Sequence, residues 1–142
     1  MATRFWEARG GRQFIGRLET GSDLVEGITA VAREHDIQAA WVTCLGAIQH
    51  ASYAFYDQEE LHYVDLESDE HHELSGFQGN ISMRNGQPFL HAHATISNIR
   101  GETVGGHLRP GCTVWVAEVH ITELTDVDLQ RTHDEITELD LW

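Results

Sequence analysis

Lysine is absent from this 142-residue sequence, so the 9 basic residues are all arginines. They stand against 23 acidic residues, and the formal net charge is −14. Because nucleic-acid affinity depends mainly on cations that neutralise phosphates, this shortage disfavours autonomous DNA binding. The only visible gathering of basic residues is Arg4, Arg9 and Arg12 near the N-terminus. A charge of this sign favours solubility and the attraction of metal cations.

Cysteine and long apolar runs are also scarce. Cys44 and Cys112 are the two cysteines and neither belongs to a CxxC motif, so no disulfide framework or thiolate zinc site is indicated. No apolar run approaches the ~20 residues that a membrane-spanning helix needs. The first residues lack the apolar stretch of a signal peptide. We therefore expect a cytosolic protein that makes no membrane contact.

The length predicts a single domain over 1–142, with 1–10 as a frayed lead-in. One helix is predicted from about Asp23 to His35, capped by Ser22 or Thr20. Its apolar residues recur at the period of 3.6 that is typical of a helix packed on a sheet. They are Leu24, Val25, Ile28, Val31 and Ala32.

The rest of the chain is dominated by strand patterns. Gly46 is expected to interrupt a buried strand, Asn85-Gly86 predicts a tight hairpin, and the acid-rich stretch 67–73 is expected to be a solvated loop that contains His71 and His72. One helix with many strands predicts an α+β fold with a largely antiparallel, barrel-like sheet. The expected strands are 13–18, 39–45, 48–57, 62–66, 74–84, 88–98, 102–110, 112–124, 128–132 and 137–142.

Three histidines lie on two of these strands. His91 and His93 are two residues apart, so on a strand they share a face, while Ala92 and Ala94 take the other. If the chain turns near residue 100, opposed residue numbers sum to 200, and His93 faces His107. Three imidazoles so placed can bind one divalent metal ion and leave a fourth position open, as in catalytic zinc sites. Gly105 and Gly106, just before His107, leave room for a ligand or for close backbone approach.

A second interpretation of the same pattern stays open. The chain contains ten histidines, so a pair at i, i+2 is unsurprising, and a buried histidine is more often a hydrogen-bonded core residue than a metal ligand. On that interpretation, removing one of the three would destabilise the fold rather than release a metal ion.

Several linked segments resemble the plants-and-prokaryotes-conserved (PPC) domain, over essentially residues 11–142. The resemblance implies a compact α+β domain that assembles as a homotrimer. The segments are GRLETGSDLVEGI at 16–28, CLGAIQHASYAFYD at 44–57, LSGFQGNIS at 74–82, PFLHAHATIS at 88–97, GGHLRPGCTVWVAEVHI at 105–121 and LQRTHDE at 129–135.

Members of this family are commonly labelled DNA-binding, because in plants the domain follows an AT-hook. This sequence has no AT-hook core, and ARGGRQ at 8–13 is not one. The label therefore depends on family association rather than on residues of this chain.

The fold of this family is also similar to that of acetolactate decarboxylase, a zinc enzyme. The resemblance implies that His91, His93 and His107 hold one zinc or another divalent transition metal per chain. Such an enzyme needs an acid or base near the metal and a cation for its substrate. Glu73 is the first candidate for acid/base or fourth ligand and Glu118 the second. Arg109, two residues past His107, is the candidate for holding an anion.

Three hypotheses follow. The first is a homotrimeric domain that binds metal and an unknown small molecule, with a regulatory role. The second is a zinc-dependent lyase, decarboxylase or hydrolase for a small carboxylate- or ester-bearing substrate. The third is a DNA-associated protein, which the charge disfavours. No GxSxG, Cys–His or phosphate-cradling glycine motif points to another chemistry.

Overall fold

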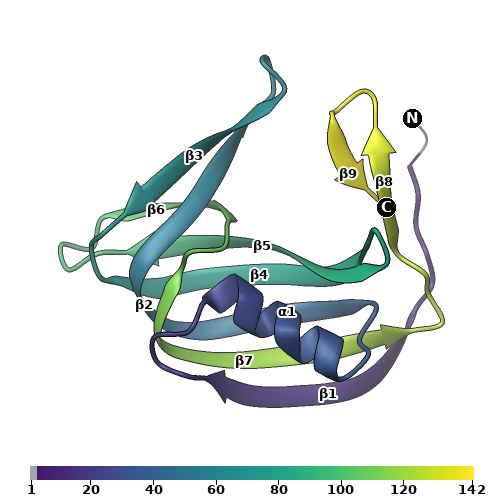
Figure 1. Cartoon of the computed structure of the whole chain (residues 1–142), viewed down its shortest axis with the longest axis horizontal. Coiled ribbons are helices and arrows are strands. Elements are labelled where there is room, and N and C mark those ends of the chain that lie inside the picture. The colour runs from purple at the N-terminus through teal and green to yellow at the C-terminus, as the bar shows by residue number, and fades with distance from the viewer. Residues whose placement is uncertain (1–2) are drawn as a thin grey trace.

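The computed structural model describes residues 3–142, which form nine strands and one helix (Figure 1). The fold is mostly β, with a large and mainly antiparallel sheet, as the sequence predicts. The elements in chain order are β1 (Arg9–Leu18), α1 (Leu24–Glu34), β2 (Ala40–Asp57), β3 (His62–Ser68), β4 (His72–Arg84), β5 (Gln87–Ser97), β6 (Thr103–Leu108), β7 (Thr113–Thr125), β8 (Gln130–Asp134) and β9 (Leu139–Leu141).

The strand pairings close part of the sheet on itself. β2 pairs with both β6 and β4, and β5 pairs with the same two strands, so β2, β6, β5 and β4 form a ring. β7 and β1 extend the sheet beyond β2, while β3 forms a hairpin with the far half of β2. The short β8–β9 hairpin joins β4 through two parallel residue pairs. The result is a barrel-like body with two projecting hairpins (Figure 1).

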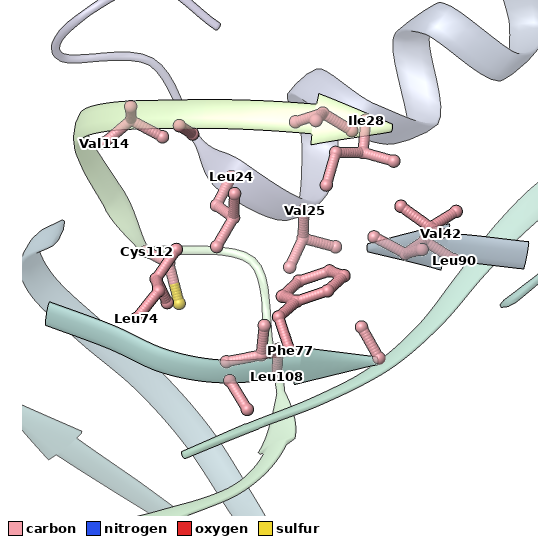
Figure 2. Close-up of a cluster of buried hydrophobic side chains, with 14 of the residues drawn as sticks. Leu24, Val25, Ile28, Val42, Leu74, Phe77, Leu90, Leu108, Cys112 and Val114 are labelled. Atoms are coloured by element: carbon pink, nitrogen blue, oxygen red, sulfur yellow. The ribbon is translucent and has the colours of Figure 1, made fainter. Parts of the chain in front are cut away.

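The main core lies between α1 and the sheet. Leu24, Val25 and Ile28 of α1 enter the same cluster as Phe77 of β4 and Leu90 of β5 (Figure 2). Burial of these side chains holds the helix in place, at roughly 1.5–3 kcal/mol for each large apolar residue. The apolar stripe predicted from the sequence is therefore the packing face of α1.

The helix and the first strand differ slightly from the predicted bounds. The N-cap is Asp23, not Ser22 or Thr20, and its carboxylate accepts a hydrogen bond from the Glu26 backbone N–H at 2.8 Å. β1 begins at Arg9 rather than residue 13, because a bulge between Gly10 and Gln13 lets the strand continue beside β7. The lead-in is thus shorter than predicted, and Trp6 within it packs edge-on against Trp142.

The sequence predicts that Gly46 interrupts its strand, and this prediction is wrong. β2 runs unbroken from Ala40 to Asp57, and pairs with β4 and β7 on both sides of Gly46. A Cβ at this position would collide with the carbonyl oxygen of Val116 on β7. The glycine therefore allows two strands to approach closely rather than ending one.

The expected loop over 67–73 is mostly strand. β3 extends to Ser68 and β4 begins at His72, so only three residues separate them. His72 is 4% exposed, and its Nε2 lies 2.8 Å from Ser68 Oγ. Because acidic residues surround His72 in the sequence, the pattern did not predict that it is buried.

Strand alternation on β7 changes at a register shift. Val114 is buried and Val116 is 39% exposed, although they are two residues apart. Ile48 of β2 pairs with Val114 while its neighbour Ala47 pairs with Val116, which places the irregularity between them. Beyond it, Ala117 and Val119 are both buried, so regular alternation resumes.

The last strands occupy different bounds from those predicted. β8 covers Gln130–Asp134 instead of 128–132, and β9 is limited to Leu139–Leu141. In residues 3–142, no helix has the length and apolar character needed to cross a membrane.

Candidate metal centre

The β5–β6 hairpin brings the three histidines together. His93 and His107 are paired across the two strands, as the sum of 200 predicts. His91 lies two residues before His93 on the same face of β5, while Ala92 and Ala94 between and beyond them are buried on the opposite face. The fold thus delivers three imidazoles to one side of a two-stranded ribbon.

The distances between the rings suit a single ion. Each histidine offers one ring nitrogen that lies within 4.8 Å of those offered by the other two. Nε2 of His91 and Nε2 of His93 are 3.2 Å apart. Two nitrogens bound to one tetrahedral zinc at 2.0–2.1 Å are separated by about 3.3 Å.

Two glycines allow β6 to come this close. A Cβ at Gly105 would collide with the Ala94 carbonyl oxygen of β5, and one at Gly106 would lie 2.6 Å from the Ala54 carbonyl oxygen of β2. Any side chain here would push β6 away from its neighbours and carry His107 with it. Of the two reasons considered for these glycines, close backbone approach is the one that the structure supports.

Burial keeps two of the imidazoles neutral. It lowers the pKa of His91 to about 4, with the positive charge of Arg131 as a further cause. It also lowers the pKa of His107 to about 3, and the other two histidines, Arg109 and Arg131 act in the same direction. Neutral imidazole is the form that binds a metal ion.

One ring nitrogen of the group lacks a partner. Nδ1 of His107 is buried and has no hydrogen bond within residues 3–142. A buried polar atom without a partner is costly, and a metal bond to one ring nitrogen leaves the other free to donate a hydrogen bond. A donor set of three imidazoles suits zinc and also copper, iron and nickel. These residues therefore fit the metal that the resemblance implies.

An open cavity of about 580 Å³ adjoins the histidines. His91 and His107 line it together with Tyr63 and Arg109, and its walls extend from α1 to the β8–β9 hairpin. The Tyr63 ring lies 5.0 Å from that of His107, and the Arg109 guanidinium lies 4.4 Å from the Tyr63 centroid. A volume of this size is typical of a small-molecule site.

The structure places Arg109 in this cavity and the two glutamates outside it. Nε of Arg109 is 3.3 Å from an Asp65 carboxylate oxygen, so a neighbouring acid already balances its charge. Glu73 pairs with Ser97, four residues beyond His93 on β5, and it lines a different hollow beside Ala47 and Trp115. At ~3.3 Å per strand residue, this distance along β5 is roughly 13 Å.

Glu118 is also remote from the histidines. It pairs with Arg17 and Leu45 on the exposed side of the β1–β7–β2 sheet. Neither glutamate lies beside the three histidines within residues 3–142.

Sequence reasoning missed Arg131. This residue lines the same cavity and is 9% exposed, and it donates hydrogen bonds to Ser82 Oγ at 2.7 Å, to Asn80 Oδ1 at 3.0 Å and to the Asp140 carbonyl at 2.9 Å. Asn80 is the strand partner of His91, so these hydrogen bonds attach the guanidinium to the strand beside the three histidines. Its only sequence signal is an arginine within an acidic tail.

Comparison with known proteins agrees with this geometry. The model of the Plants and Prokaryotes Conserved (PCC) domain family matches residues 6–125. The chain belongs to this family, which confirms the resemblance seen in its sequence.

Two solved structures are similar over nearly their whole length. A metal-containing protein from Archaeoglobus fulgidus is 36% identical, with a TM-score of 0.94 and 99% of each chain covered. A plant- and prokaryote-conserved protein from Pyrococcus horikoshii is 27% identical, with a TM-score of 0.92 and coverage of 99% of this chain and 96% of that one.

Among curated proteins, the bifunctional protein GlmU of Synechococcus sp. (strain JA-2-3B'a(2-13)) is 30% identical over 123 residues. The match covers 85% of this chain and only 18% of the GlmU protein. The chain thus spans about a fifth of the length of that relative.

Proposed function

We propose that this chain binds one divalent transition metal ion, zinc in the first instance, on His91, His93 and His107. The observation that carries the proposal is the convergence of three histidine ring nitrogens within 4.8 Å of one another. The description of the A. fulgidus relative as metal-containing supports it. A three-histidine site leaves a coordination position free, and the adjoining cavity gives a small molecule access to it. The expected role is metal-dependent binding of a small ligand, with a regulatory function.

Elemental mass spectrometry tests the metal site directly. The full chain, purified without an affinity tag or added metal, should contain about one zinc or iron per chain. His93→Ala should lose this metal and stay folded, because the side chain is exposed and the core contains none of its atoms. His71→Ala is the matched control, since His71 is also an exposed histidine and lies in the β3–β4 turn.

Two results would contradict the metal site. One is a wild-type protein that neither contains metal nor takes it up on titration. The other is aggregation of His93→Ala with no metal in the wild type, which would identify the histidines as a hydrogen-bonded cluster that supports the fold.

The same site supports a second candidate function, a zinc-dependent lyase, decarboxylase or hydrolase. The presence of Arg109 in the cavity beside His107 favours it, because a cation can hold the carboxylate of a substrate. Zinc-loaded protein would be assayed on a panel of β-keto acids and esters. Turnover that disappears in His93→Ala and persists in His71→Ala would establish an enzyme, and no turnover on the panel would leave the binding role.

DNA association is the least supported alternative. The net charge of −14 and the absence of lysine oppose phosphate binding. A mobility-shift assay with excess duplex DNA at low salt gives any phosphate-binding contribution its best chance. We expect no mobility shift. A shift that disappears in moderate salt would support DNA binding through phosphate contacts.

A homotrimer is the assembly that we propose for this chain. The family resemblance implies it, and a surface feature supports it. The outer face of β1, β7 and β2 carries apolar side chains that nothing covers within residues 3–142. Ile15 is 88% exposed, Leu45 65% and Trp41 46%, and their strand pairings place them on one face. Apolar patches of this kind mark protein–protein contacts.

A further inference from the structure

Arg131 is a buried cation without an acidic partner. Among residues 3–142, five arginines have a carboxylate oxygen within 4.0 Å, and three others without one are exposed to solvent. Arg131 alone is both buried and without a carboxylate at this distance. Burying a charge without a counter-charge is costly, so buried charges in proteins are usually paired. The five paired arginines are Arg9, Arg12, Arg84, Arg100 and Arg109.

The hydrogen bonds of Arg131 leave part of its guanidinium unused. Its three bonds go to a hydroxyl, a side-chain amide oxygen and a backbone carbonyl, all of them neutral acceptors. A guanidinium carries five N–H donors, so two remain without a partner within the described chain. Two N–H groups of one guanidinium match the two oxygens of a carboxylate.

The position of Arg131 connects these donors with the metal centre. Arg131 and His91 line the same cavity, and the acceptors Asn80 and Ser82 are the strand partners of His91 and Phe89. His91 and Phe89 lie on the same face of β5 as His93. An anion on Arg131 would therefore occupy the cavity that the histidines adjoin.

The other cavity walls limit the kind of anion. Phe89 contacts two guanidinium groups. Its ring centroid lies 5.3 Å from the guanidinium carbon of Arg131 and 3.8 Å from the guanidinium carbon of Arg84. Leu90 and Leu108 add further apolar surface. The carboxylates of Glu138 and Asp140 also line the cavity, and they would repel a phosphate dianion more strongly than a single carboxylate.

We propose that Arg131 binds the carboxylate of a small monocarboxylate whose short apolar body packs on Phe89. This inference extends the proposed function by naming the class of ligand, and it rests on that function in placing the ligand in the cavity beside the three histidines. Arg109 is the weaker candidate for the same anion, because Asp65 already faces it.

Butanoate and inorganic phosphate are the probes that test this proposal. Ligand-observed NMR titration of the protein as purified should give saturable binding of butanoate that phosphate does not match. Arg131→Gln should weaken butanoate binding about tenfold or more, since it removes charge-assisted hydrogen bonds. Arg17→Gln, which makes the same change at an exposed position on β1, should leave binding unchanged.

A second measurement needs no variant, because Arg131 also attaches β8 to β4 and its replacement can cause misfolding. Intermolecular nuclear Overhauser effects between butanoate protons and the Arg131 and Phe89 side chains of the wild-type protein would locate the ligand. Their presence is expected. Contacts confined to other residues would overturn the proposal.

Metal analysis of the same samples separates the two proposals. Three results with metal-containing protein would refute the carboxylate site and leave the metal site standing. They are no binding of butanoate, binding that is equally strong in the Arg131→Gln variant, and a preference for phosphate. Metal-free protein that still binds butanoate through Arg131 would refute the metal site and leave the carboxylate site.

Discussion

At the scale of single residues, the meeting of the three imidazoles depends on two glycines of β6 that have no Cβ atom. Gly105 and Gly106 have no side chain where β6 passes the backbones of β5 and β2. His107 directly follows these glycines, so its ring position depends on how closely β6 approaches. The close approach that brings His107 to His91 and His93 is thus made by main-chain contacts.

Gly105→Ala should therefore damage both stability and the metal site. The new Cβ would meet the Ala94 carbonyl oxygen, and backbone cannot move aside as a flexible side chain can. We expect a loss of about 1–3 kcal/mol in the free energy of unfolding, as for other overpacked positions, together with weaker zinc binding. Denaturant unfolding and competition with a zinc chelator measure the two effects.

Gly16→Ala is the matched control, because it makes the same change on β1 where no atom lies within 4 Å of the added Cβ. It should be close to neutral. Equal stability of Gly105→Ala and Gly16→Ala would show that β6 can shift without cost.

The sequence allowed the three histidines to be predicted but not Arg131. Alternation along a strand and one turn position determine that His91 and His93 share a face and that His93 meets His107. Arg131 reaches the site through hydrogen bonds to residues 49 and 51 positions earlier in the chain. Its strand, β8, pairs with β4 through only two residue pairs. No local sequence pattern predicts this pairing.

At the scale of elements, the two ends of the sheet are secured by polar contacts. The β1 bulge turns Arg12 toward Glu123 of β7, and the guanidinium donates two hydrogen bonds of 2.7 Å to its carboxylate. On the opposite side, the hydroxyl of Tyr56 on β2 donates a hydrogen bond to the Thr137 carbonyl between β8 and β9. This bond links the two hairpins that project beside the cavity.

The Arg12–Glu123 pair predicts a pH-dependent contribution to stability. The hydrogen bond from Arg12 lowers the pKa of Glu123 below its ordinary value of 4.5. Its contribution is therefore present above pH ~4.5 and lost as the pH falls through the folded-state value. The difference in unfolding free energy between wild type and Glu123→Gln should be largest at pH 7, at most about 1 kcal/mol because Arg12 is half exposed, and should decrease below pH ~4.5. A difference that is constant from pH 7 to pH 3 would contradict this assignment.

Tyr56→Phe should loosen the β8–β9 hairpin without unfolding the core. The change removes one hydrogen bond, with an expected cost of about 1 kcal/mol. Hydrogen exchange should become faster for the amides of β8 and β9 and stay unchanged in β7. Tyr53→Phe, which removes a hydroxyl from a core residue of the same strand, is the control. Uniform changes across all strands would show that the bond supports the whole fold instead.

Element identity followed from the sequence more readily than element bounds. The helix, the Asn85-Gly86 hairpin and the β5–β6 pairing follow from periodicity and turn chemistry. Three of the misplaced details, at Gly46, at the β1 bulge and near Val114, occur where two strands meet out of register. A bulge depends on the partner strand, so the pattern of one strand alone does not reveal it.

At the scale of the whole molecule, the exposed apolar face of β1, β7 and β2 predicts self-association. Leu45→Glu would place a charge in the centre of this face and should shift the protein from three chains toward one. Sedimentation equilibrium measures the mass directly. Ile136→Glu, at an equally exposed apolar residue in the β8–β9 turn, should leave the assembly intact. A wild-type protein that sediments as a single chain would remove the trimer.

The placement of all three histidines on one side of a ribbon has a consequence for the choice of metal. These residues would hold an ion from that side, and two of them, His91 and His107, also line the cavity. Zinc held by three histidines would accept one further ligand atom, whereas a metal that takes six ligands would accept more. The metal supplied by the cell would then determine whether an incoming molecule is held by one atom or chelated.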